Sequence, residues 1–130
     1  MRFVLSLGDR AMLSMLYSDA IELYTCAIAF CCSDPLYHFN RAHAFYRLHK
    51  YVEATEDAEK SIHIDPNFSK VYDLLGLIYC AQGKYHDAID QGFVKALELD
   101  PGDESFTRNI QFAHQKLGDA DTAQEDQVIS

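Results

Sequence analysis

The chain is poor in basic residues. Its 11 lysines and arginines stand against 20 aspartates and glutamates, which gives a formal net charge of −9. Nucleic-acid binding depends on Lys and Arg side chains that neutralise phosphates and release counterions. The charge balance therefore argues against a nucleic-acid-binding protein.

Long apolar runs are also missing. No stretch approaches the roughly 20 apolar residues that a bilayer-spanning helix needs. The short apolar run Phe3-Val4-Leu5 is interrupted by Gly8-Asp9-Arg10, too early for a secretory signal. We therefore expect a cytosolic protein with no membrane span.

The patterns of metal sites and active sites are absent as well. The cysteines do not form the CxxC pairs of a zinc site, and no two histidines form a helical i, i+4 metal pair with a supporting carboxylate. There is no glycine-rich phosphate loop and no nucleophile elbow. We expect no metal, no cofactor and no enzymatic activity. We also expect the thiols to be reduced and buried at helix interfaces, rather than joined as a strained Cys31–Cys32 disulfide. The four cysteines are Cys26, Cys31, Cys32 and Cys80.

One helical-hairpin pattern occurs three times along the chain. Tyr17, Tyr51 and Tyr85 each open the second helix of a pair, and an Ala follows three residues later, at a constant period of 34 residues. This period is typical of tetratricopeptide repeats (TPRs), whose helix pairs bury their apolar faces only when about three of them stack. The pattern predicts an all-α fold: a TPR superhelix of three helix-turn-helix repeats plus a C-terminal capping helix.

Local signals predict where the helices begin and end. Asp34 is a good N-cap and is followed by Pro35 at the first helical position, while Pro66 and Pro101 end the preceding helices. Gly118 suits a left-handed C-cap. The predicted helices are 2–15, 18–32, 35–48, 51–64, 69–82, 85–99 and 103–117. The predicted domains are a TPR domain at 1–118, with repeats at about 1–34, 35–68 and 69–102 and a capping helix at 103–117, and an acidic flexible tail at 119–130.

Two finer features concern the packing of helix pairs. Gly8, Ala42 and Gly76 occupy equivalent positions and predict close approach of the paired helices. In the third repeat the spacing from Ala88 to Ala96 is one residue longer than in the other two. A helix accommodates one inserted residue as a π-bulge, so we predict an i→i+5 hydrogen bond or a kink near Gly92.

The third repeat and the cap resemble those of a known family. The segments that carry the resemblance are Asp65-Pro66-Asn67-Phe68-Ser69-Lys70-Val71-Tyr72, Gly76-Leu77, Lys95-Ala96-Leu97-Glu98-Leu99-Asp100-Pro101, Asn40-Arg41-Ala42, Asn109-Ile110 and Gln115-Lys116-Leu117. Together they resemble the TPR domain of the small glutamine-rich TPR co-chaperones. The run from Tyr79 to Tyr85 and the inserted residue are most similar to the plant members. The resemblance covers residues 1–117.

The resemblance implies a cytosolic adaptor. Members of this family hold heat-shock chaperones by their acidic C-terminal tails and pass on hydrophobic clients. They also carry a dimerisation domain and a glutamine-rich client-binding region. Residues 1–130 contain neither, so we expect a monomer.

The family binds the tail through a carboxylate clamp of Lys, Asn and Arg side chains. Only Asn40 and Lys70 keep this pattern here, because Leu5, Asp9 and Leu74 stand at the other three positions. Loss of two charge-assisted contacts at about 1.5–3 kcal/mol each would weaken binding by roughly a hundredfold to ten-thousandfold. Asp9 would add repulsion against an acidic tail.

The same positions predict a largely apolar groove. Its expected apolar lining is Leu5, Met12, Leu13, Phe39, Tyr46, Leu74 and Leu77. The alternative is that these side chains are ordinary core. The two interpretations weigh equally for Met12, Leu13 and Leu77. The groove is favoured for Leu5 and Leu74. Partial rescue of anion binding by Arg2, His43 or Arg47 is a further possibility, which we disfavour because an out-of-register charge does not reproduce the clamp. The candidate peptide-binding residues are Leu5, Asp9, Asn40, His43, Lys70 and Leu74.

Three hypotheses follow. The first is a co-chaperone-like TPR adaptor that binds a protein or peptide segment in its concave groove, with a degraded clamp. The second is retained weak binding of heat-shock chaperone C-terminal tails in client targeting. The third, from another class, is a self-assembling structural repeat.

Overall fold

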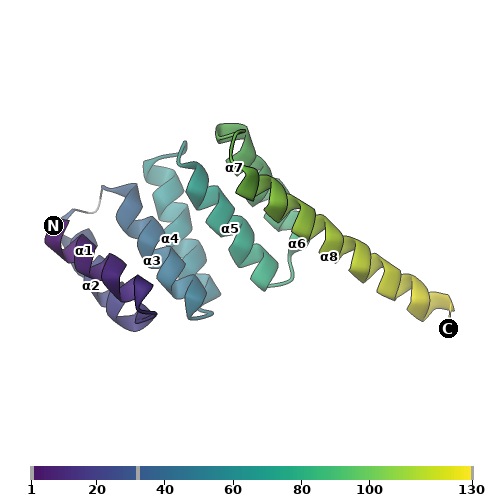
Figure 1. The fold of residues 1–130 in the computed structure, drawn as a ribbon, viewed down its shortest axis with the longest axis horizontal. Coiled ribbons are helices and arrows are strands. Elements are labelled where there is room, and N and C mark those ends of the chain that lie inside the picture. The colour runs from purple at the N-terminus through teal and green to yellow at the C-terminus, as the bar shows by residue number, and fades with distance from the viewer. Residues whose placement is uncertain (1, 32, 130) are drawn as a thin grey trace. The chain divides into compact units, whose positions relative to one another are not determined.

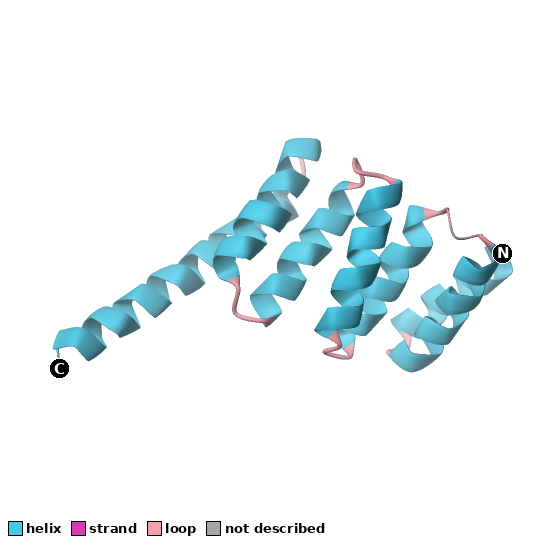
Figure 2. Ribbon diagram, turned by 180° about the vertical axis from the view of Figure 1, so that it is seen from behind, coloured by secondary structure: helices cyan, strands magenta, loops and turns pink. Residues whose placement is uncertain are grey.

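The computed structural model describes residues 2–31 and 33–129. The chain divides into two compact units, Met1–Val71 and Tyr72–Ser130. The described elements are α1 (Arg2–Leu13), α2 (Tyr17–Phe30), α3 (Pro35–Arg47), α4 (Tyr51–Ile64), α5 (Ser69–Ala81), α6 (Tyr85–Asp87), the π-helix η1 (Ala88–Phe93), α7 (Val94–Leu99) and α8 (Glu104–Ile129). Figure 2 shows that helices and short loops make up the described chain, as an all-α fold requires.

The first unit is built from two antiparallel helix pairs, α1 with α2 and α3 with α4, which lie side by side in Figure 1. The start of α3 follows the predicted chemistry. Asp34 accepts a hydrogen bond from the Leu36 amide at 2.9 Å, and Pro35 takes the first helical position. The prediction of this N-cap is confirmed.

A buried ion pair joins three helices of the first unit. Arg41 on α3 donates from Nε to Asp57 Oδ2 at 2.7 Å and from Nη2 to Asp57 Oδ1 at 2.8 Å. The same guanidinium donates from Nη1 to Thr25 on α2 at 3.1 Å. Asp57 on α4 is only 2 % exposed, and His38 lies 3.4 Å from it. Because a buried carboxylate is costly without partners, these contacts favour one arrangement of α2, α3 and α4.

The turns inside the helix pairs repeat with the sequence period. Met15, His49 and Gly83 each have a positive φ, between 61° and 76°, and stand 34 residues apart. Only the third of these positions carries glycine, the residue that adopts this conformation without steric cost. The backbone thus repeats even where the sequence does not.

Glycines allow close helix approach in both units. A Cβ on Gly8 would lie 2.5 Å from the Tyr24 ring, and one on Gly76 would lie 2.4 Å from the Phe93 ring. Ala42 is fully buried at the equivalent place in the second repeat. The prediction that these small residues permit close packing is confirmed.

The predicted irregularity near Gly92 is also confirmed. Ala88–Phe93 forms a π-helix between α6 and α7, and the Val94 amide bonds to the Ile89 carbonyl, five residues back. A Cβ on Gly92 would meet the Gly76 backbone at 2.6 Å. The inserted residue is therefore accommodated where Gly92 lets η1 pack directly against the backbone of α5.

Three boundary and burial predictions are wrong. α8 does not end at 117 but continues through Gly118 to Ile129, well beyond the other helices of its unit (Figure 1). One glycine costs a helix only about 1 kcal/mol, and the residues after it include good helix formers.

Cys26 and Cys31 are exposed rather than buried, and Cys80 is partly buried. Burial and the nearby Asp73 carboxylate raise the pKa of the Cys80 thiol to about 11.

Candidate functional site

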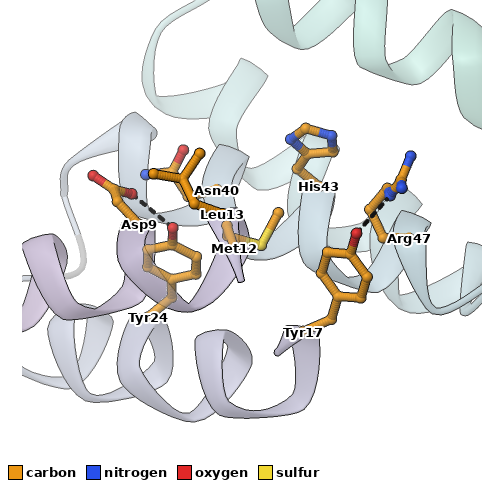
Figure 3. A pocket seen from close by; sticks show the side chains of 8 residues that line it. All are labelled: Asp9, Met12, Leu13, Tyr17, Tyr24, Asn40, His43 and Arg47. Carbon is orange, nitrogen blue, oxygen red and sulfur yellow. Dashed lines mark hydrogen bonds between the residues drawn. The ribbon is translucent and has the colours of Figure 1, made fainter. Parts of the chain in front are cut away.

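The candidate site is a pocket of about 450 Å³ in the first unit, shown in Figure 3. Its volume falls in the range of roughly 300–1,000 Å³ that is common for ligand pockets. Side chains from α1, α2 and α3 or their immediate ends line it: Asp9, Met12, Leu13, Tyr17, Tyr24, Asn40, His43 and Arg47. The pocket thus brings four polar or charged groups to an apolar and aromatic surface.

One end of the pocket carries a carboxylate. Tyr24 on α2 donates its hydroxyl to Asp9 Oδ1 on α1 at 2.7 Å. The tyrosine is 1 % exposed, whereas Asp9 is exposed. Burial, followed by the hydrogen bond and the negative charge of Asp9, raises the pKa of Tyr24 well above its usual value of 10.0. The hydroxyl therefore stays protonated and holds the carboxylate in place.

The other end carries a guanidinium. Arg47 on α3 donates from Nε to the Tyr17 hydroxyl at 3.1 Å, and its Cζ lies 5.5 Å from the centroid of the Tyr17 ring. A cation over an aromatic face at this distance is attracted by the ring quadrupole. His43 lies one helical turn before Arg47. Desolvation, followed by the Arg47 charge, lowers the pKa of His43 below 6.5.

Aromatic rings continue along α3 from this pocket. Phe39 lies 5.1 Å from Phe68 and 6.4 Å from His43, measured between ring centroids. Tyr46 lies 6.3 Å from His43 and 6.3 Å from Tyr51. Rings in this distance range pack favourably with one another. They give one side of α3 a continuous aromatic surface.

The predicted site residues do not all come together. Asp9, Asn40 and His43 line the pocket, and so do Met12 and Leu13. Lys70 is exposed on α5 and is not among the lining residues.

The two leucines that replace clamp cations lie largely in core. Leu5 is partly buried and packs against the cluster of Ala11, Ala20, Tyr24 and Ala44. Leu74 is only 4 % exposed. The preference for a groove-facing Leu74 is therefore wrong, because helical spacing shows which residues share a face but not how deeply a neighbouring helix covers them. Leu77, for which the interpretations were balanced, packs against the core of the second unit.

Three pocket residues were missed or disfavoured. From the sequence, Tyr17 enters only as part of the repeat pattern, Tyr24 is not singled out, and Arg47 is disfavoured as out of register. The signal that could have found Arg47 is its i, i+4 spacing from His43, which places both on one face of a helix. For the tyrosines no single-helix pattern was available, since their partners lie on other helices.

The part of the chain that the structure describes contains neither a metal site nor a membrane-spanning helix. No group of three His, Cys, Asp or Glu side chains within the described residues is placed to hold a metal ion. None of the helices in this part of the chain is long and apolar enough to cross a membrane.

Comparison with known proteins identifies both the fold and the family of this chain. Residues 35–68 and 58–90 match family models described as "Tetratricopeptide repeat". The crystal structure of the Sgt2 TPR domain from Aspergillus fumigatus is similar with a TM-score of 0.86 and 30% sequence identity, over 93% of this chain and 81% of that one. The chain belongs to the small glutamine-rich tetratricopeptide repeat family. The predictions of the fold class and of the family are confirmed.

One curated relative is much longer than this chain, and one similar TPR domain is known with a bound peptide. Small glutamine-rich tetratricopeptide repeat-containing protein 2 of Mycosarcoma maydis is 32% identical over 89% of the chain, but the match covers 33% of that protein. The chain thus spans about a third of the length of this relative. The second TPR domain of human RPAP3, solved in complex with the HSP70 peptide SGPTIEEVD, has a TM-score of 0.78 and 29% identity over 84% of this chain and 90% of that one. The finer similarity to plant members stays a prediction.

Proposed function

We propose that this TPR domain is a non-enzymatic, cytosolic protein-interaction adaptor of the co-chaperone type, which binds a peptide segment in the pocket between α1, α2 and α3. The observation that carries the proposal is the convergence of Asp9, Asn40, His43 and Arg47 on one pocket, whose other lining residues are Met12, Leu13, Tyr17 and Tyr24. Such a few orienting polar groups on an apolar surface are common in recognition sites. The HSP70 peptide SGPTIEEVD bound by the related RPAP3 domain supports a peptide segment as the ligand.

Binding of an acidic chaperone tail would be weak. Leu74 is buried, Leu5 packs against core, and Lys70 lies outside the pocket, so few cations of the clamp pattern remain. Arg47 supplies a positive charge in the pocket, and His43 adds one when it is protonated. Asp9 opposes an acidic ligand at the other end. The first two hypotheses, an adaptor with a degraded clamp and an adaptor that still binds chaperone tails weakly, thus differ only in the affinity of the pocket for an acidic tail.

The experiment is calorimetric titration of SGPTIEEVD into the wild-type chain and into an Asn40→Ala variant. The Asn40 amide can hydrogen-bond a peptide backbone, and its loss should weaken binding by about tenfold, the equivalent of ~1.4 kcal/mol. Asn67→Ala is the matched control, since Asn67 is exposed in the first unit and outside the pocket. Restoring the clamp cation with Leu74→Arg is not a suitable test, because Leu74 is buried and the variant would place a charged side chain in the core. Equal affinity of the two variants would contradict binding in this pocket.

Self-assembly is the second candidate, and exposed apolar side chains favour it. Phe3 is 74 % exposed, Leu13 85 %, and Phe30 79 %, all on the α1–α2 pair. Large apolar side chains that stay exposed are candidates for contacts between copies of a chain. Static light scattering over a range of concentrations distinguishes the candidates. A strictly monomeric mass at high concentration excludes self-assembly, and a mass that rises with concentration supports it.

A further inference from the structure

The pocket of the first unit has opposite charges at its two ends. In Figure 3, Asp9 lies beside Tyr24 at one end and Arg47 lies beside Tyr17 at the other, with Asn40, Met12, Leu13 and His43 placed between or around them. Among the described residues no ion pair joins Asp9 to Arg47, and both side chains line the pocket. The pocket therefore presents both charges to a ligand.

Each charge is held by a tyrosine of α2. Asp9 accepts the hydroxyl of the buried Tyr24 at 2.7 Å, and Arg47 donates to the hydroxyl of Tyr17 at 3.1 Å while its guanidinium lies over that ring. Side chains that are already ordered lose less conformational entropy when a ligand binds. The pocket thus presents a preorganised carboxylate and a preorganised guanidinium at opposite ends, with Met12 and Leu13 between them.

We propose that this pocket selects a peptide segment that carries both a cationic side chain and a carboxylate. The Lys or Arg side chain of the ligand meets Asp9, and its carboxylate, from a chain end or an acidic side chain, meets Arg47. The inference rests on the proposed function and narrows its ligand. A uniformly acidic segment would bring a like charge to Asp9, which opposes binding, whereas a mixed segment is complementary at both ends.

The amide of Asn40 and the ring of His43 suit the rest of such a ligand. An amide offers both donors and an acceptor, so Asn40 can pair with a peptide backbone without a preference for charge. Met12 and Leu13 offer apolar contact to the side chains in between. Charge selection is therefore assigned to Asp9 and Arg47 alone, which makes it separable by mutation.

The test compares peptides that differ at one position. SGPTIEEVD is titrated beside the analogues SGPTIKEVD and SGPTIEKVD and their Gln counterparts, into the wild-type chain and into Asp9→Asn. At least one Lys peptide should bind wild type about fivefold more tightly than its Gln counterpart, the upper range for an ion pair at a partly exposed site. Asp9→Asn should lose this preference, although the Asn oxygen can still accept from Tyr24.

Asp19→Asn is the matched control. It makes the same chemical change on α2, at an exposed position outside the pocket, and should keep the wild-type preference for Lys. Peptides that bind wild type without any preference for Lys over Gln would overturn this inference and leave the proposed function standing. A preference that persists in Asp9→Asn would overturn it equally. If none of the peptides binds either chain, the proposed function fails together with the inference.

Discussion

Desolvation of the His43 imidazole opposes its protonation, and the guanidinium charge of Arg47, one helical turn away on α3, acts in the same direction. The pKa of His43 is therefore lower in the folded chain than its ordinary value of 6.5. In the unfolded chain the ring takes up a proton as the pH falls through about 6.5, and the folded chain resists this. His43 therefore favours unfolding at acidic pH and has no such effect at higher pH.

Replacement of His43 by Gln should make the stability less dependent on pH. Between about pH 7.5 and about pH 5.5, the urea midpoint of His43→Gln should fall less than that of wild type, because the variant has no imidazole to protonate at this position. His63→Gln is the control, since His63 is exposed on α4 and outside the pocket. An equal fall in wild type and His43→Gln would contradict the lowered pKa.

At the level of helices, the π-helix Ala88–Phe93 depends on a residue without a side chain. A Cβ on Gly92 would lie 2.6 Å from the Gly76 backbone and 2.9 Å from the Tyr72 carbonyl oxygen, and neither is the movable end of a side chain. Backbone must shift to admit it. Gly118 on α8 differs, since a Cβ there meets nothing within 4 Å.

The same substitution should therefore have opposite effects at the two glycines. Gly92→Ala should lower the free energy of unfolding by about 1–3 kcal/mol, the usual cost of overpacking. Gly118→Ala should raise it by roughly 0.5–1 kcal/mol, because alanine favours an exposed helix interior over glycine. Urea denaturation followed by circular dichroism measures both. A tolerated Gly92→Ala would mean that α5 and η1 are not as closely packed as described.

For the molecule as a whole, the sequence predicted the repeats better than the site. The spacing of Tyr17, Tyr51 and Tyr85 is a one-dimensional signal, and so is the inserted residue near Gly92, which is why the helix pairs and the π-helix were predictable. The burial of Leu74 and the contact between Asp9 and Tyr24 depend on packing between helices. Such packing has no counterpart in the spacing along one helix.

The overall charge of −9 bears on the partner as well. A strongly acidic domain repels an acidic tail at long range, and salt screens this repulsion over a Debye length of about 8 Å at physiological ionic strength. A ligand with one cationic side chain is repelled less. The charge of the whole domain and the Asp9 carboxylate in its pocket thus both favour a ligand with a cationic side chain over a uniformly acidic one.

The central claim is that a peptide binds in the pocket between α1, α2 and α3. An amide NMR titration of the whole chain with SGPTIEEVD and SGPTIEKVD tests it most directly. Saturable shifts centred on Asp9, Asn40 and Arg47 are the predicted result. Shifts confined to residues outside the pocket, or no shifts with either peptide, would contradict the account.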